Sequence, residues 1–210
     1  MGGIKPEEFD AFHEQIGTEE LSRVGSGGAA WGSPASRETR SSVWRVSPRA
    51  RVSLCLDRAC EAGLLMSLCS LCSLPSSSVT EPTAGSDVAN LKTTAKKTAD
   101  GKHYIVNGEK KWITNGVFAD FFTTAVRTGE EGMGGVSLLV IERSKGVKTT
   151  QMKCSGVWPS GTTYVEFDDV LVPVENLIGK ENQGFRYIMY NFNHERSAHT
   201  HTCSMGSRGQ

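Results

Sequence analysis

VTEPTAGSD at Val79–Asp87 and KKWITNG at Lys110–Gly116 bracket a series of short β-prone runs. Asp100-Gly101 and Asn107-Gly108 lie between these two stretches, and both dipeptides signal hairpin turns because glycine accepts a positive φ. No alternation of strands with long helical segments follows, so a parallel dinucleotide-binding fold is not expected. The pattern predicts an antiparallel β-barrel or sandwich across residues 88–173.

The individual strands are predicted from apolar and β-branched runs bounded by turn residues. Trp112 and Thr114 alternate with Ile113, so we expect both to lie on one face of a strand. The predicted strands are Thr93–Lys97, Tyr104–Val106, Lys111–Asn115, Phe121–Arg127, Val136–Glu142, Tyr164–Phe167 and Val170–Val172.

Helical patterns flank this β-region, which makes the expected class α+β with partial helical segments on both sides. Residues 1–32 carry apolar residues near helical spacing and end in a glycine-rich stop. From Gln183 onward, an apolar helix face is formed by Phe185, Ile188, Met189 and Phe192. This face fades after Arg196, and we expect it to lack a partner in the chain.

Two segments fit neither helical nor strand periodicity. Residues 33–78 carry arginine but no lysine and are rich in serine and proline. Residues 197–210 are polar. We interpret both as aberrant segments from a faulty or alternative gene model, and a disordered linker is the alternative for residues 33–78. We expect few long-range contacts and little sheet in either.

Composition excludes several classes of protein. The 210 residues carry 23 basic and 23 acidic side chains, so nothing in the net charge indicates a nucleic-acid or anionic membrane partner. No apolar run reaches the ~18 residues that a membrane span requires. The N-terminus shows no apolar signal core, and an intracellular protein is expected.

The cysteine pattern is weak evidence for metal. Of the six cysteines, Cys69 and Cys72 have zinc-like spacing and could combine with Cys55 and Cys60. Apolar residues surround this pair instead of a tight polar knuckle. A zinc module across residues 55–72 is therefore the least favoured interpretation, and we predict no metal site.

The two bracketing stretches carry candidate ligand-binding chemistry. Thr80 and Ser86 supply hydroxyl and backbone donors, and Gly85 lets the backbone come close to a ligand. Such groups could hold ring carbonyls or a pyrophosphate, although Ser86-Asp87 could also be a simple turn cap. Trp112 could stack on a planar ring or pack in the core.

Together the two stretches resemble the acyl-CoA dehydrogenase family. Its signature pairs Thr-Glu-Pro-x-x-Gly-Ser-Asp with a following Trp-x-Thr-Asn-Gly strand. Residues 158–163, 167–173 and 176–185 also match the family pattern. The resemblance covers Val79–Arg196, and residues 3–32 resemble a late part of the family's N-terminal helical domain. It implies a fragment of that domain at 1–32, a middle β-domain at 79–180 and the start of a C-terminal helical domain at 181–196.

The resemblance also implies an FAD site. Val79 and Thr80 would meet the pyrimidine side of the ring, and Gly85 and Ser86 would lie by the pyrophosphate or the thioester entrance. Trp112 would pack on the isoalloxazine, and Thr114 would donate near its N5. The substrate-binding residues implied are Ser86 and Ser160, the latter near the CoA moiety.

Activity of this chain is not expected, although the family oxidises acyl-CoA thioesters between the α- and β-carbons. The family's base lies in its C-terminal domain, so no catalytic residue is assigned here. A catalytically inactive FAD- or acyl-CoA-binding β-domain, or a subunit-association fragment, is the alternative. The resemblance further implies an electron-transfer flavoprotein or another electron acceptor, a homo-oligomer, and a mitochondrial or peroxisomal location.

Overall fold

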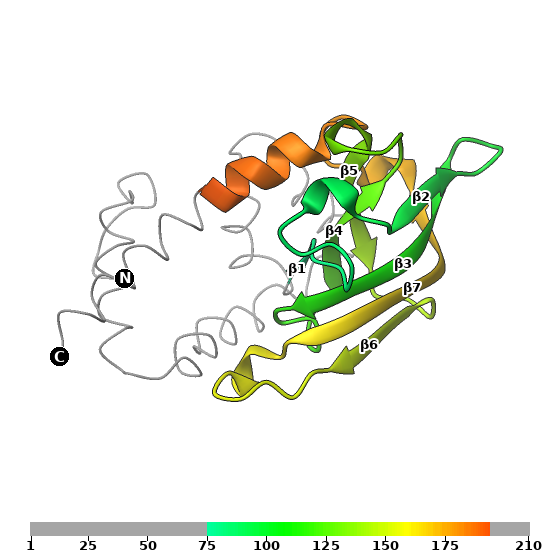
Figure 1. Cartoon of the computed structure of the whole chain (residues 1–210). Coiled ribbons are helices and arrows are strands. Elements are labelled where there is room, and N and C mark those ends of the chain that lie inside the picture. The colour runs from blue at the N-terminus through cyan, green and yellow to red at the C-terminus, as the bar shows by residue number, and fades with distance from the viewer. Residues whose placement is uncertain (1–74, 194–210) are drawn as a thin grey trace, which may run out of the picture.

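The structure, a computed structural model, describes residues 75–193 of the 210-residue chain (Figure 1). These residues form a curled, mixed seven-stranded sheet in the order β1-β4-β2-β3-β7-β6, with β5 paired to β4. The strands are β1 Pro75–Ser78, β2 Thr94–Lys97, β3 His103–Ile113, β4 Phe121–Arg127, β5 Val136–Glu142, β6 Val147–Gln151 and β7 Thr163–Pro173.

Short 3-10 helices lie in the connections, and one longer helix follows the sheet. The 3-10 helices are η4 Val88–Asn90, η5 Met133–Gly135, η6 Trp158–Ser160 and η7 Val174–Asn176. Residues 184–193 form the longer helix, drawn in orange in Figure 1. The described residues therefore form a mostly β fold with helical residues at its C-terminal side, which confirms the predicted β-domain and the helix after it.

Two apolar clusters fill the two faces of the β4–β5 hairpin. The first includes residues of β3, β4, β5 and β7, and in it Phe122 meets Phe167 edge-on with ring centroids 6.4 Å apart. The second covers the other face and includes Leu91, Phe121, Leu138 and Ile188. Burial on both faces explains why β5 is an almost unbroken apolar run instead of an alternating one.

Most of the predicted strands are confirmed, but the sheet is not purely antiparallel. β1 pairs in parallel with β4, from Pro75 beside Phe121 to Ser78 beside Thr124. β2 also meets β4 in parallel, at Thr94 and Arg127. Parallel pairs join segments that are distant in the chain, so local turn signals could not reveal them.

The prediction of little sheet in residues 33–78 is wrong for its last four residues. β1 consists of Pro75–Ser78, and Ser76 and Ser78 are buried. A serine-rich tetrapeptide has no apolar alternation, and it is held in the sheet by backbone pairing to β4. Residues 1–74 and 194–210 lie outside the described residues, and so do the predictions made for them. β6 was not predicted either.

The prediction of a hairpin turn at Asn107-Gly108 is wrong. β3 runs through this dipeptide, and the register shift between Val106 and Gly108 places the extra residue in β7, where Asp168 and Asp169 lie between the partners Phe167 and Val170. Gly108 has φ 147°, and a Cβ there would lie 2.6 Å from the Thr93 Cα, so glycine allows the segment before β2 to approach β3 closely. Asn107 and Asp169 exchange two 2.8 Å hydrogen bonds. Asp169 has φ 48°, and the two strands predicted on either side of it are the single strand β7.

The C-terminal helix has a partner, contrary to the expectation of an uncovered face. Ile188 is 3% exposed and belongs to the second apolar cluster, with Phe185, Met189 and Phe192 packed partly against it. The Gly184 position would place a Cβ 2.7 Å from the Ser137 backbone, so the helix begins in direct contact with β5.

Replacing Ile188 with alanine is expected to destabilise the fold by about 2 kcal/mol through lost burial and a residual cavity. Urea unfolding monitored by circular dichroism measures this loss. Tyr190→Ala is the matched control on the same helix, because Tyr190 is 61% exposed. Equal effects of the two substitutions would show that the helix is not packed on β5 in solution.

Candidate functional site

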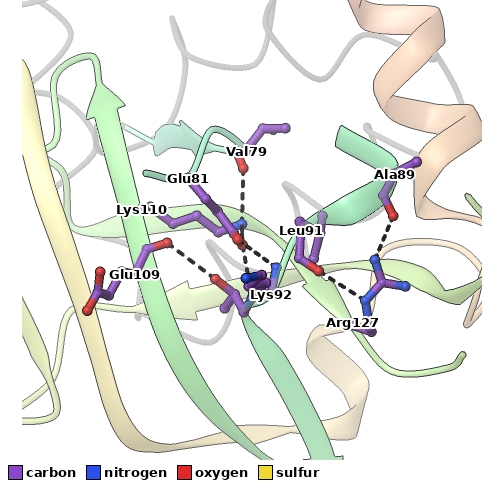
Figure 2. Close-up of polar contacts among 9 residues, drawn as sticks. Val79, Glu81, Ala89, Leu91, Lys92, Glu109, Lys110 and Arg127 are labelled. Carbon is purple, nitrogen blue, oxygen red and sulfur yellow. Dashed lines mark hydrogen bonds and ion pairs between the residues drawn. The ribbon is translucent and has the colours of Figure 1, made fainter. Parts of the chain in front are cut away.

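The loop that follows β1 lies against the end of β3, so the structure brings the two bracketing stretches together. The Lys111 amide donates a 2.9 Å hydrogen bond to the Thr80 carbonyl. One residue earlier on each side, Lys110 Nζ donates a 3.0 Å bond to the Val79 carbonyl. Figure 2 shows the second contact. The backbone of Val79 and Thr80 is thus fixed relative to the strand that leads to Trp112.

A buried ion pair lies at the centre of this contact. Lys110 Nζ is 2.9 Å from Glu81 Oε1, and their side chains are 0% and 2% exposed. The Glu81 carboxylate also accepts a 2.6 Å hydrogen bond from the Lys92 amide (Figure 2). The Thr93 amide donates a further 2.9 Å bond to it. Each charge therefore has several polar partners, which a pair removed from water requires.

The pKa values of the pair follow from burial and mutual attraction. Burial lowers the pKa of Lys110 to about 8, although the Glu81 charge opposes that shift. Burial alone would raise the pKa of Glu81, but the Lys110 charge and the hydrogen bonds from Lys92 and Thr93 lower it below its ordinary 4.5. Both groups are consequently charged between about pH 5 and pH 7.

Acid should weaken the fold through Glu81. Because its folded pKa lies below its unfolded value, its contribution is present above pH 4.5 and is lost as the pH falls through the folded pKa. We expect the difference in unfolding free energy between the parent chain and Glu81→Gln to shrink from pH 6 to pH 3. Urea titrations at several pH values measure it, and a difference that grows toward acid would contradict the assignment.

Arg127 fixes the next part of the loop. Its guanidinium donates to the carbonyls of Ala89 at 2.7 Å and Leu91 at 3.0 Å, as Figure 2 shows. The same guanidinium donates to the backbone carbonyls of Glu130 at 2.5 Å and Gly132 at 3.2 Å. The end of β4 therefore holds both η4 and the loop before β5.

Trp112 is presented by an unusual backbone. It has φ 63°, which is rare for a bulky aromatic, and it lies at a bulge of β3 between Lys110 and Ile113. Its side chain is 54% exposed, and Lys111 Nζ lies 5.1 Å from its ring centroid. Packing of this indole in the core, the alternative to a stacking role, does not occur among the described residues.

Thr114 follows in a turn. It is exposed, as Trp112 is, and Ile113 between them is buried, in keeping with the predicted alternation. β3 nevertheless ends at Ile113, so Thr114 does not lie on the strand face that it was predicted to share with Trp112. The Thr114 carbonyl accepts a 2.5 Å hydrogen bond from Ser76 Oγ of β1. A single bulge and turn therefore set the direction of both side chains.

The remaining predicted site residues lie in two different settings. Gly85 and Ser86 are exposed on the loop, and a Cβ at Gly85 would meet no protein atom within 4 Å. Ser160 is 5% exposed in η6, and its hydroxyl lies 2.7 Å from that of Thr162. Its carbonyl accepts a 2.8 Å hydrogen bond from the Asn115 amide, which joins η6 to the turn after Trp112.

Glu81, Lys110 and Arg127 are the polar residues that sequence reasoning missed. A signal did exist for Lys110, because strict alternation with Tyr104 and Val106 places it on the buried face of β3. A buried lysine needs a buried anion, and Glu81 is the first acid of the signature loop, as we call residues 79–87. For Arg127, whose partners are backbone carbonyls of two loops, the sequence offered no such signal.

Fold and site define a β-domain in which the loop at residues 79–87 lies against the bulged end of β3. The family model for the acyl-CoA dehydrogenase middle domain matches residues 76–170. Residues 76–170 are such a middle domain, and the chain belongs to the acyl-CoA dehydrogenase family.

Curated relatives and a solved structure agree. The acyl-CoA dehydrogenase apdG of Emericella nidulans is 45% identical over 196 residues, which cover 92% of this chain and 43% of apdG. The acyl-CoA dehydrogenase AFT10-1 of Alternaria alternata is 39% identical, covering 93% and 43%. A probable acyl-CoA dehydrogenase of Mycobacterium abscessus superposes with a TM-score of 0.72 at 38% identity, covering 93% and 50%. The chain thus spans less than half the length of these two curated relatives.

No helix in residues 75–193 is long and apolar enough to cross a membrane.

Proposed function

We propose that this chain supplies the flavin-facing wall of an FAD-dependent acyl-CoA dehydrogenase. The observation that carries the proposal is Trp112, a large indole held 54% exposed by a left-handed backbone beside the signature loop. Backbone strain of this kind persists where surrounding contacts impose it, and it is common at ligand sites. A planar ring is the ligand that an exposed indole suits best.

The residues of the two stretches would contact different parts of the cofactor. Val79 and Thr80 would bind the pyrimidine side of the ring, Trp112 would pack on its face, and Thr114 would donate near N5. Gly85 and Ser86 would lie toward the pyrophosphate, and the open position at Gly85 leaves room for a ligand there. Bound FAD would supply the acceptor for the hydride that leaves the β-carbon of the acyl group.

The proposed substrate is an acyl-CoA thioester, with Ser86 and Ser160 on its side of the ring. An electron-transfer flavoprotein is the proposed electron acceptor, and a homo-oligomer the proposed assembly. A mitochondrial or peroxisomal location is proposed as well, and the isobutyryl-CoA dehydrogenase of Bos taurus, 39% identical over 142 residues, is named as mitochondrial.

FAD titration of the purified 210-residue chain tests the cofactor, with flavin fluorescence as the readout. We expect quenching on binding, and Trp112→Ala should weaken binding about tenfold, equivalent to about 1.4 kcal/mol. Trp158→Ala is the matched control, because Trp158 is a second indole, 52% exposed, outside the predicted flavin-binding set. Equal losses in both variants would contradict stacking on Trp112.

Binding without turnover is the second candidate function, and the engaged carboxylates of the signature favour it. Glu81 is paired with Lys110, and Asp87 accepts a hydrogen bond from the Asn90 side chain. A general base must be free to reach the substrate proton. Mixing the chain with FAD, a series of acyl-CoA thioesters and an artificial electron acceptor should therefore give no steady turnover; turnover with any chain length would contradict this candidate.

A further inference from the structure

The Glu81–Lys110 pair joins three separate segments at one buried point. Lys110 belongs to β3, Glu81 to the signature loop, and the Lys92 and Thr93 amides to the connection between η4 and β2. Lys110 also holds the Val79 carbonyl directly. The pair therefore fixes where the loop backbone lies relative to the strand that presents Trp112, two residues after Lys110.

Stability alone is a weak reason to bury two opposite charges. A buried pair often stabilises a fold no better than apolar side chains of the same volume, because desolvation offsets the attraction. What the pair does provide is a fixed orientation of the backbone groups around it. Lys110 donates to a carbonyl and a carboxylate together, and Glu81 accepts from two amides. Apolar replacements would fill the space and leave those backbone groups without defined partners.

We infer that Glu81 and Lys110 are positioning residues for the flavin wall, and this inference rests on the proposed function. They act through the backbone of Val79, Thr80 and Trp112 and do not themselves contact the ring. Because the Thr80 carbonyl is already used by the Lys111 amide, a shift of the loop would also shift the turn that carries Trp112. Loss of the pair should weaken FAD binding and alter the environment of the bound ring.

The test compares Glu81→Gln and Lys110→Met with the parent 210-residue chain. FAD dissociation constants come from fluorescence titration, and circular dichroism between 300 and 500 nm reports how the ring is held. We expect at least about tenfold weaker binding and an altered flavin band in folded Glu81→Gln. Lys97→Met and Glu181→Gln are the controls, because that 2.8 Å pair has side chains 45% and 33% exposed and should leave both readouts unchanged.

Hydrogen exchange on the unmodified chain gives a second test that does not depend on the variants folding. If the pair links the loop to the ring, FAD binding must slow exchange at the Lys111 and Thr93 amides more than at amides of β6. Bound FAD with no added protection at these two amides would overturn the inference. So would folded Glu81→Gln with parental affinity and parental flavin band shape.

Failure of the proposed function has a different signature. The parent chain, the variants and both control substitutions would then all leave FAD fluorescence unchanged, and the inference would fall with the function on which it rests. Parental binding that survives loss of the pair would instead overturn the positioning role alone.

Discussion

Replacing Lys110 with methionine is expected to lower the free energy of unfolding by about 3–5 kcal/mol, because it leaves the Glu81 carboxylate buried without its counter-charge. The Val79 carbonyl loses its 3.0 Å donor at the same time. The Lys92 and Thr93 amides still donate to the carboxylate, so the loss is not that of an isolated buried charge. Urea unfolding at pH 6, where both groups are charged in the parent chain, measures the difference.

A double-mutant cycle separates the pair from its surroundings. Glu81→Gln removes the charge and keeps one oxygen that can accept a hydrogen bond from an amide. When Glu81→Gln and Lys110→Met are combined, the loss should be smaller than the sum of the single losses, because no unpaired charge remains. Lys97→Met breaks an exposed pair and should cost less than about 1 kcal/mol. Strict additivity of the two buried substitutions would show that they do not interact.

The sequence predicted those strands whose pattern is local. Phe121–Arg127 and Val136–Glu142 are rich in β-branched and apolar residues, and both are strands with the predicted bounds. Asp100-Gly101 is a turn between β2 and β3, as expected. Pro75–Ser78 has no such pattern, and its place in the sheet depends on β4, more than forty residues later in the chain. Long-range parallel pairing has no signature within four residues.

The glycine at position 108 shows how one signal can have two structural outcomes. Glycine suits a hairpin turn and a close approach of two backbones within a sheet equally, and the sequence does not distinguish them. The close approach of Thr93 distinguishes them, and it exists only once β2 has paired with β3. The same limit applies to the site. The Val79–Asp87 and Lys110–Gly116 stretches were expected to form one site, but the buried pair of Glu81 and Lys110 that joins them was not predicted.

Replacing Gly135 with alanine is expected to destabilise the fold by about 3 kcal/mol or more, at the upper end of the cost of overpacking. Gly135 is buried at the end of η5, and a Cβ there would lie 1.8 Å from the Glu130 carbonyl oxygen and 2.8 Å from Arg127 Nη1. That carbonyl accepts a 2.5 Å hydrogen bond from the same Nη1 atom. Relief of the clash therefore has to move the group that Arg127 binds.

The loop before β5 has little freedom to move away. The Gly135 carbonyl accepts hydrogen bonds from the Thr128 and Gly129 amides at 3.0 and 3.1 Å, so it is held from the opposite side. Strain at Gly135 should pass through Arg127 to the carbonyls of Ala89 and Leu91, which faster exchange of the amides in residues 88–91 would report. Gly134→Ala is the matched control one residue away, because a Cβ at Gly134 meets no atom within 4 Å. It should change the free energy of unfolding by less than about 1 kcal/mol. Similar losses from both substitutions would mean that glycine flexibility in η5, and not the contact between Gly135, Glu130 and Arg127, sets the stability of this loop.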